Sequence, residues 1–185
     1  GGSQGTHRSI STSGFAPDYD RILRALEKRF GGSWVVFLRL HPQLTARHIQ
    51  VQAENSNLID VSRADDMYEL LAGCDALVTD YSSVSFDTLV TPIPAFLYVE
   101  DYRAYEAERG KLLWNLDELP FPWAMDNDGL ETNITAFDEK AYAKGVQRFL
   151  DMAKMAEPGT ASAHTVDFIM NWVDGEKGGI DHANI

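Results

Sequence analysis

The chain has 185 residues and a mass of 20.7 kDa, which fits one domain or one half of a two-domain enzyme. A content of 44% hydrophobic and 24% charged residues is typical of a globular protein and excludes a disordered one. The net charge of −12 argues against non-specific nucleic-acid binding, which depends on basic surface. The single cysteine, Cys74, excludes an internal disulfide and a cysteine-rich zinc site, so a reducing, cytosolic compartment is expected.

Composition along the chain predicts three segments. Residues 1–14 are small and polar, which predicts a flexible Gly/Ser-rich loop. Residues 15–173 carry the apolar periodicity and are expected to form one domain. Residues 174–185 are Gly-rich and polar, which predicts a frayed tail. No apolar run approaches the roughly 20 residues that cross a bilayer.

Helical and strand patterns alternate within the domain. Apolar spacing predicts a helix that Pro17 opens and Gly31-Gly32 end. The continuous apolar run 34–38 predicts a strand covered on both faces. Further strands are expected at 58–61, 76–79 and 93–99, and further helices at 66–73, 83–90, 138–155 and 161–173. Strands separated by such helices predict an α/β fold with right-handed crossovers and one mostly parallel sheet.

Polar residues follow directly after two of the expected strands. Arg39 and His41 follow the first strand, and Thr79-Asp80-Tyr81-Ser82-Ser83 follows the third. Because ligands of open α/β sheets bind at the carboxyl ends of the strands, both motifs are expected at one rim of the domain. The second motif leads into a helix, whose N-terminal amides and dipole favour an anion. Together the two motifs favour a phosphate site.

Each motif also has a structural interpretation. Ser83 can be only a helix N-cap, Asp80 only a turn former, and His41 only a structural residue at a strand end. A nucleophilic triad of His41, Asp80 and Ser82 is disfavoured, because the hydrolase elbow requires small neighbours where Tyr81 and Ser83 stand.

The remaining polar segments point less clearly to chemistry. No histidine or aspartate spacing indicates a metal site, and the acidic segment 126–129 predicts a solvated turn. Segment 105–110 either places Arg109 near the rim or forms a surface charge run. The apolar loop 119–123, which prolines restrict, packs either against a nucleotide base or against the core.

Four motifs occur in a recognisable order from about Pro17 to Trp172. They are Leu38-Arg39-Leu40-His41-Pro42, Leu77-Val78-Thr79-Asp80-Tyr81-Ser82-Ser83, Glu108-Arg109-Gly110 and Gly159-Thr160-Ala161-Ser162. In this order they resemble the CDP-glycerol glycerophosphotransferase family of teichoic-acid and related polymer synthesis. Phe121 and Pro158 depart from residues common in that family, which is typical of a divergent branch.

The resemblance implies a Rossmann-like domain with helices on both faces, as in the C-terminal half of a GT-B architecture. It implies that this domain binds a CDP-linked donor. The implied donor-binding residues are Arg39, His41, Thr79, Asp80, Ser82, Ser83, Arg109 and Gly110. Among them, His41 is implied to stabilise the donor phosphate, and no residue of this chain is assigned as catalytic. The general base is expected in an N-terminal domain outside these residues, and neither a metal nor a cofactor is implied.

The expected function follows from this resemblance. It is donor binding for the transfer of glycerol phosphate, or a related polyol phosphate, from a CDP-linked donor to a polymer or primer hydroxyl. The expected partners are CDP-glycerol or a similar donor and a polymer or lipid-linked acceptor held mainly by the N-terminal domain, without nucleic acid. The location is expected to be cytoplasmic, with the parent protein peripheral on the inner face of the cell membrane, and the chain alone is expected to bind without turnover.

Two other functions stay open from the sequence. A GT-B glycosyltransferase domain that uses a nucleotide-sugar would have the same pyrophosphate site. A non-catalytic nucleotide-binding module would need no transfer chemistry. The chain also starts where relatives have a further strand, so an exposed sheet edge is expected to pair with residues 6–13 or with a second copy in a homodimer.

Overall fold

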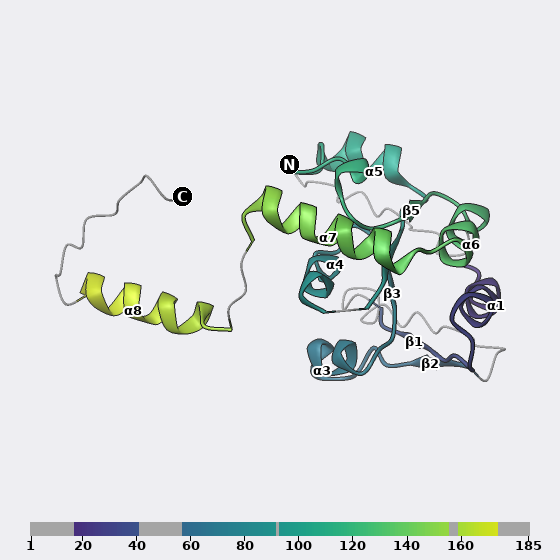
Figure 1. Cartoon of the computed structure of the whole chain (residues 1–185), viewed down its shortest axis with the longest axis horizontal. Helices are drawn as coiled ribbons and strands as arrows, with labels where there is room; N and C mark the ends of the chain where they lie inside the picture. The colour runs from purple at the N-terminus through teal and green to yellow at the C-terminus, as the bar shows by residue number, and fades with distance from the viewer. Residues whose placement is uncertain (1–16, 41–56, 92, 156–158, 174–185) are drawn as a thin grey trace, which may run out of the picture. The chain divides into compact units, whose positions relative to one another are not determined.

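The computed structural model describes residues 17–40, 57–91, 93–155 and 159–173. They belong to two compact units, Gly1–Phe149 and Leu150–Ile185, and the sheets and the candidate site belong to the first unit (Figure 1). His41, the expected loop 1–14 and the expected tail 174–185 lie outside the described residues. The predicted domain boundaries, the pairing of residues 6–13 and the homodimer therefore stay predictions.

Strands and helices alternate along the described chain, which confirms the α/β class. In chain order the elements are α1 (Tyr19–Phe30), β1 (Val36–Leu38), β2 (Leu58–Asp60), α3 (Met67–Ala72), β3 (Leu77–Thr79), α4 (Val84–Asp87), η2 (Thr88–Val90), β4 (Ala95–Tyr98), α5 (Tyr102–Arg109), η3 (Leu116–Glu118), β5 (Trp123–Ala124), α6 (Asn127–Thr135), α7 (Glu139–Ala153) and α8 (Ala161–Val173). No described helix is both long and apolar enough to span a bilayer.

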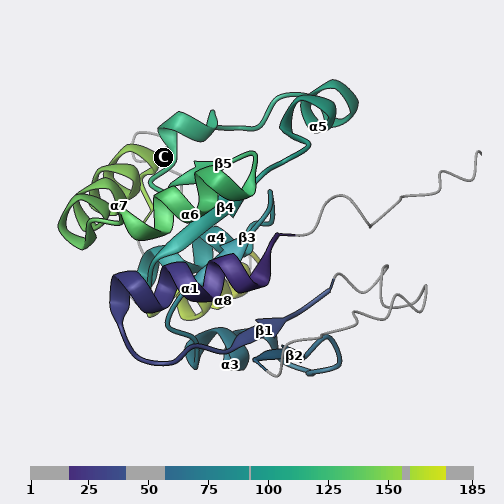
Figure 2. The same cartoon turned by 90° about the vertical axis from the view of Figure 1, so that its right-hand side faces the viewer.

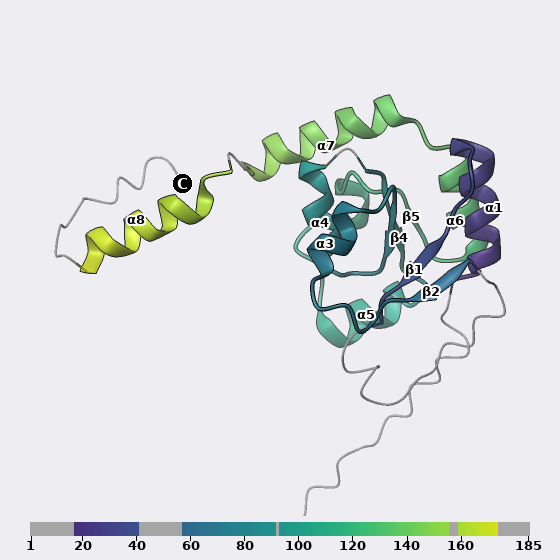
Figure 3. The same cartoon turned by 90° about the horizontal axis from the view of Figure 1, so that it is seen from below.

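All strand pairs in the described residues are parallel. β1 pairs with β2, and a separate sheet has the order β3-β4-β5. The single sheet expected from the sequence is therefore two hydrogen-bonded sheets in the described part of the chain. Such short strands form few ladder hydrogen bonds, so a twist between neighbours is enough to interrupt the ladder. Figure 3 shows helices on both sides of β4, with α1 and α6 on one side and α4 on the other.

Helix α1 begins at Tyr19, two residues after the predicted start at Pro17, ends before Gly31 as predicted, and packs on α6. The side chain of Asp18 accepts a hydrogen bond from the Arg21 N–H at 3.0 Å and caps the helix. Gly31 follows the last turn at a φ of +76°, where side chains are disfavoured. Arg21 Nε also donates to Glu131 Oε2 at 2.7 Å, which joins α1 to α6.

The core lies around β4. Every residue of β4 is buried, and the Phe96 ring meets the Phe137 ring edge-on with centroids 5.3 Å apart. The sequence predicts a strand covered on both faces for the run 34–38, and that prediction is wrong, because Phe37 is 47% exposed between two half-buried neighbours. β1 is therefore covered on one face only.

The sequence pattern does not predict α5, α6 or β5. Segment 126–129 is not a solvated turn, because Asp126 accepts the Gly129 N–H at 2.7 Å and caps α6. The buried Leu130 and Ile134 then hold this helix on the core. In the loop 119–123, Phe121 is 2% exposed, so this loop packs the core.

Candidate functional site

The turn after β3 carries the motif Thr79-Asp80-Tyr81-Ser82-Ser83. Asp80 Oδ1 accepts the Ser82 N–H at 3.0 Å, so Asp80 forms the turn through its side chain. This confirms the turn-forming role considered for Asp80. It also means that the Ser82 N–H is already used within the protein. Thr79, the last residue of β3, is half-buried beneath this turn.

Ser82 and Ser83 are exposed at the tip of the turn. The Val84 N–H donates to Ser82 Oγ at a long 3.5 Å. Ser83 precedes α4 with φ −61° and ψ −12° and makes no side-chain cap hydrogen bond. Because a capping residue is normally extended and bonds to the helix amides, Ser83 is not a side-chain cap. Two consecutive exposed serines therefore follow β3 in this turn.

The helix that follows is shorter than predicted. Instead of a helix over residues 83–90, α4 has four residues and continues as the 3-10 helix η2. Ser85 Oγ donates to Ser82 O at 3.0 Å, and Thr88 Oγ1 donates to Ser85 O at 2.7 Å. Such bonds to the carbonyl three residues earlier compete with regular α-helical pairing. Since few peptide dipoles align in α4, an anion at this turn depends mainly on hydroxyls and nearby cations.

The third side chain of the turn, Tyr81, contacts α5. Its hydroxyl donates to Asp101 Oδ1 at 2.9 Å. Its ring stacks on the Tyr105 ring, with centroids 3.9 Å apart and an interplanar angle of 17°. Burial, followed by the hydrogen bond to Asp101, raises the pKa of Tyr81 well above its ordinary value. The phenol therefore remains a proton donor across the physiological pH range.

Arg109 is the last residue of α5 and is exposed. It lies four residues after Tyr105, so both residues belong to one face of the helix. Gly110 follows at a φ of +88°, which favours glycine, and its N–H donates to Glu106 O at 2.9 Å. The segment is thus a helix, and the spacing of four residues assigns Arg109 to the helix face that carries Tyr105.

The end of β1 forms a second polar group. Arg39 Nη1 donates to the Ala64 carbonyl at 3.1 Å, which links the segments after β1 and β2. The Ser62 N–H donates to Asp60 Oδ1 at 2.9 Å. Hydrogen bonds from Ser62 lower the pKa of Asp60 below its ordinary value. Sequence reasoning missed Asp60 and Ser62, although polar residues directly after a strand were the signal used elsewhere.

The described site residues belong to two sheets whose strands run toward one side. Figure 2 shows β1 and β4 running toward the side of the first unit on which α5 lies. β3 runs parallel to β4, so the segment after β1 and the turn after β3 lie toward this side of the first unit, and their joint contact with a ligand stays a prediction. Within the described residues, no cluster of His, Cys, Asp and Glu side chains is suited to hold a metal.

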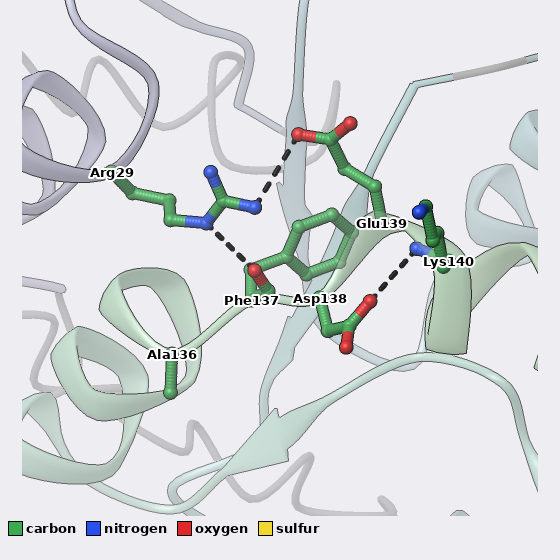
Figure 4. Close-up of a pocket in the computed structure, with 6 residues that line it drawn as sticks. All are labelled: Arg29, Ala136, Phe137, Asp138, Glu139 and Lys140. Carbon is green, nitrogen blue, oxygen red and sulfur yellow. Dashed lines mark hydrogen bonds and ion pairs between the residues drawn. The ribbon is translucent and has the colours of Figure 1, made fainter.

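One surface hollow lies away from these residues (Figure 4). It encloses about 450 Å³ and is lined by Arg29, Ala136, Phe137, Asp138, Glu139 and Lys140. Arg29 Nε donates to Phe137 O at 2.7 Å and Nη2 contacts Glu139 Oε1 at 3.3 Å. These groups join α1 to the start of α7. None of the described candidate residues lines this hollow, so it is not the candidate site.

A second hollow of about 250 Å³ lies beside the turn after β3. Asp80 and Tyr81 line it, and the rest of its wall is mainly apolar. The other lining residues are Ser85, Phe86, Leu97, Leu112, Leu113, Trp114, Leu116 and Leu119. The candidate site is therefore the turn after β3, flanked by this hollow and by α5.

Comparison with known proteins identifies relatives of this chain. The chain is 31% identical to the teichoic acid poly(glycerol phosphate) polymerase of Staphylococcus epidermidis over 147 residues, 78% of this chain and 20% of that protein. It is 32% identical to the teichoic acid glycerol-phosphate transferase of Staphylococcus aureus over 143 residues, 76% of this chain and 36% of that protein. The chain thus spans well under half the length of these relatives.

A solved structure of the wall teichoic acid polymerase TagF superposes with a TM-score of 0.65 at 27% identity, covering 91% of this chain and 42% of that one. A TagF structure soaked with CDPG gives a TM-score of 0.62 at 29% identity, covering 83% and 39%. Residues 5–171 match the family described as CDP-glycerol:poly(glycerophosphate) glycerophosphotransferase. With nearly its whole length matched, this chain belongs to that family.

Proposed function

We propose that this chain is the donor-binding domain of a transferase that moves glycerol phosphate, or a related polyol phosphate, from a CDP-linked donor to a polymer or primer hydroxyl. Family membership supports this, as do relatives named for glycerol-phosphate and ribitol-phosphate transfer. The observation that carries the proposal is the turn after β3. It presents two exposed hydroxyls, Ser82 and Ser83, at the end of a parallel strand and beside α5.

In this proposal the domain holds the donor pyrophosphate. The hydroxyls of Ser82 and Ser83 donate to phosphate oxygens, and such charge-assisted bonds are stronger than neutral ones. Arg39 and Arg109 supply local positive charge against a net charge of −12. His41 adds a donor or a cation from the segment after β1, a role taken from the family resemblance.

The reaction is a phosphoryl transfer. The acceptor hydroxyl oxygen attacks the phosphorus that bears the polyol, and the bond from that phosphorus to the bridging oxygen breaks, which releases CMP. The protein contributes orientation and stabilisation of charge on the pyrophosphate. We assign the base that takes the hydroxyl proton, and the acceptor site, to the part of the relatives that this chain does not match. Contact of the parent protein with the inner face of the membrane is assigned there too.

Titration calorimetry with CDP-glycerol on the 185-residue chain tests this proposal. Binding is expected in the roughly micromolar-to-millimolar range usual for enzyme substrates. Ser82→Ala and Ser83→Ala are each expected to weaken affinity about ten- to a hundredfold, because each loses a charge-assisted hydrogen bond. Their melting temperatures should stay close to that of the wild type, since both hydroxyls are exposed.

The matched control is Ser33→Ala, an exposed serine outside the turn, which should leave affinity unchanged. Unchanged affinity in both turn variants would contradict the proposed site. Competition with UDP-sugars separates the alternative of a nucleotide-sugar glycosyltransferase, because tighter UDP-sugar than CDP-glycerol binding would favour it. Chelation with EDTA is expected to leave donor binding unchanged.

A further inference from the structure

Tyr81 lies at the centre of the motif, but its side chain has no role in the proposed donor contacts. The phenol points to α5, twenty residues further along the chain, where it donates to Asp101 Oδ1. It therefore connects the turn that carries Ser82 and Ser83 with the helix that carries Arg109. The connection joins two of the groups proposed to meet the donor.

Asp101 contacts Tyr81 and makes no capping hydrogen bond to its own helix. It occupies the N-cap position of α5, yet its side chain makes no cap hydrogen bond to that helix. An N-cap aspartate normally accepts from the amides of the first turn. Here the described contact of the carboxylate is the Tyr81 hydroxyl at 2.9 Å. The start of α5 is therefore tied to the turn after β3.

A second contact one helical turn further on adds orientation. The Tyr105 ring stacks nearly parallel on Tyr81 with centroids 3.9 Å apart, and the Tyr102 ring lies at 6.4 Å. Contacts at Asp101 and Tyr105, four residues apart, define both the position of α5 and its rotation about its axis. Arg109 comes four residues later on the same face, about 6 Å further along the axis.

We propose that Tyr81 is a positioning residue. It aligns α5 so that Arg109 binds the same donor pyrophosphate as Ser82 and Ser83. This inference rests on the proposed function, because it takes the donor site as given. Tyr81 acts through α5 and Arg109 and does not touch the donor. Its effect on affinity therefore depends on the presence of the Arg109 guanidinium.

A double-mutant cycle with CDP-glycerol as the titrant tests this dependence. Tyr81→Phe keeps the ring and removes the hydroxyl, and it is expected to weaken affinity about five- to tenfold. In an Arg109→Ala background the same change is expected to alter affinity by less than about twofold, because residues that act through one another are not additive. Asp101→Ala should match Tyr81→Phe, whereas Asp101→Asn keeps an acceptor oxygen and should retain most of the affinity.

Tyr102→Phe is the matched control. The Tyr102 hydroxyl donates to Glu106 Oε1 at 2.9 Å within α5, so this variant loses a phenol of the same cluster without losing the connection to the turn. It is expected to keep wild-type affinity. Melting temperatures of all variants show whether a loss of affinity comes from unfolding, and Asp101→Ala replaces Tyr81→Phe if the latter does not fold.

The outcomes separate this inference from the proposed function. Wild-type affinity in Tyr81→Phe, together with weakened affinity in Ser82→Ala, would overturn the inference alone. An equal loss from Tyr81→Phe with and without Arg109 would also overturn it, because Tyr81 would then act independently of Arg109. Wild-type affinity in both Ser82→Ala and Arg109→Ala would instead overturn the proposed donor site.

Discussion

The two sheets of the first unit contain similar apolar strands that are buried to different extents. All of β4 is buried between β3 and β5, with helices on both sides (Figure 3). In the β1–β2 pair, Phe37 is 47% exposed and Ile59 is 44% exposed. The apolar content of the strands is alike, so the difference comes from the number of neighbouring elements. A strand with a partner on each side and a helix on each face is removed from water on all sides.

The residues of the candidate site are attached to sheets that differ in burial. The turn after β3 is anchored to the buried sheet, whereas Arg39 is attached to the partly exposed pair. We therefore expect substitutions in the β3-β4-β5 sheet to change the free energy of unfolding. Substitutions in the β1–β2 pair should leave it almost unchanged. The predictions below test that division in order of decreasing effect.

Phe96→Ala should have the largest effect. The side chain is fully buried and packs on Phe137, so its removal leaves a cavity that costs about 3–5 kcal/mol of unfolding free energy. Urea denaturation followed by circular dichroism measures this loss. A loss below about 1 kcal/mol would show that the core does not lie around β4.

Tyr142→Phe should have an intermediate effect. The Ala95 N–H, at the start of β4, donates to the Tyr142 hydroxyl at 3.2 Å. Without the hydroxyl, this backbone donor loses its partner, at a cost of about 1–3 kcal/mol for a buried group. Urea denaturation measures the change, and Tyr68→Phe, at an exposed tyrosine, is the control that should change nothing.

Tyr142 should also affect how the free energy of unfolding depends on pH under alkaline conditions. Burial raises the pKa of Tyr142 above its ordinary value. The folded state then holds its proton where the unfolded state has lost it, so this contribution is present below the unfolded pKa of about 10 and disappears as the pH rises through the folded pKa. The unfolding midpoint of the wild type should fall more steeply above pH 10 than that of Tyr142→Phe. Equal slopes would contradict the prediction.

Phe37→Thr should change stability little. The side chain is about half exposed on an outer face of β1, so we expect a change within about 0.5 kcal/mol. The same urea denaturation measures it, with Phe96→Ala as the contrasting variant. Hydrogen exchange provides a second measurement, because amides of β1 should exchange faster than those of β4. A cost close to that of Phe96→Ala would show that another element covers this face.

Ser62→Ala is tested on a titration, since Ser62 Oγ also accepts the Leu40 N–H at 2.9 Å and its removal affects that contact as well as Asp60. The Ser62 hydrogen bonds lower the pKa of Asp60, so removal of the hydroxyl should raise that pKa toward its ordinary value. The stability from this group is present above the unfolded pKa and is lost as the pH falls through the folded pKa. An NMR titration of the Asp60 carboxyl measures the change, and an unchanged pKa would contradict the assigned contact.

Several features could be predicted because their signals are local. The C-terminal end of α1 follows from Gly31, which acts through its own backbone conformation, and its start follows from the Asp18 cap, which bonds three residues ahead. The turn-forming role of Asp80 depends on a bond to a residue two positions later. The position of the turn after β3 follows from the change from apolar to polar residues at Thr79 and Asp80.

Other features could not be predicted because distant contacts decide them. An aspartate followed by a nearby glycine, as at 126–129, is typical of both a turn and a helix start. The packing of Leu130 and Ile134 in the core decides for the helix. Likewise, apolar spacing over 83–90 fits an α-helix, but bonds from Ser85 and Thr88 to earlier carbonyls tighten its second half into a 3-10 turn.

The sequence by itself determined where polar residues follow strands, which family motifs the chain carries and where its first helix ends. These properties depend on residues within a few positions of one another. The tertiary structure decided which apolar strand is buried and which helix Tyr81 meets. Burial of β4 depends on β3, β5 and the helices that cover them, and the Tyr81–Asp101 bond joins residues twenty positions apart. Only the folded chain brings such partners together, because their contact depends on the path of the backbone between them.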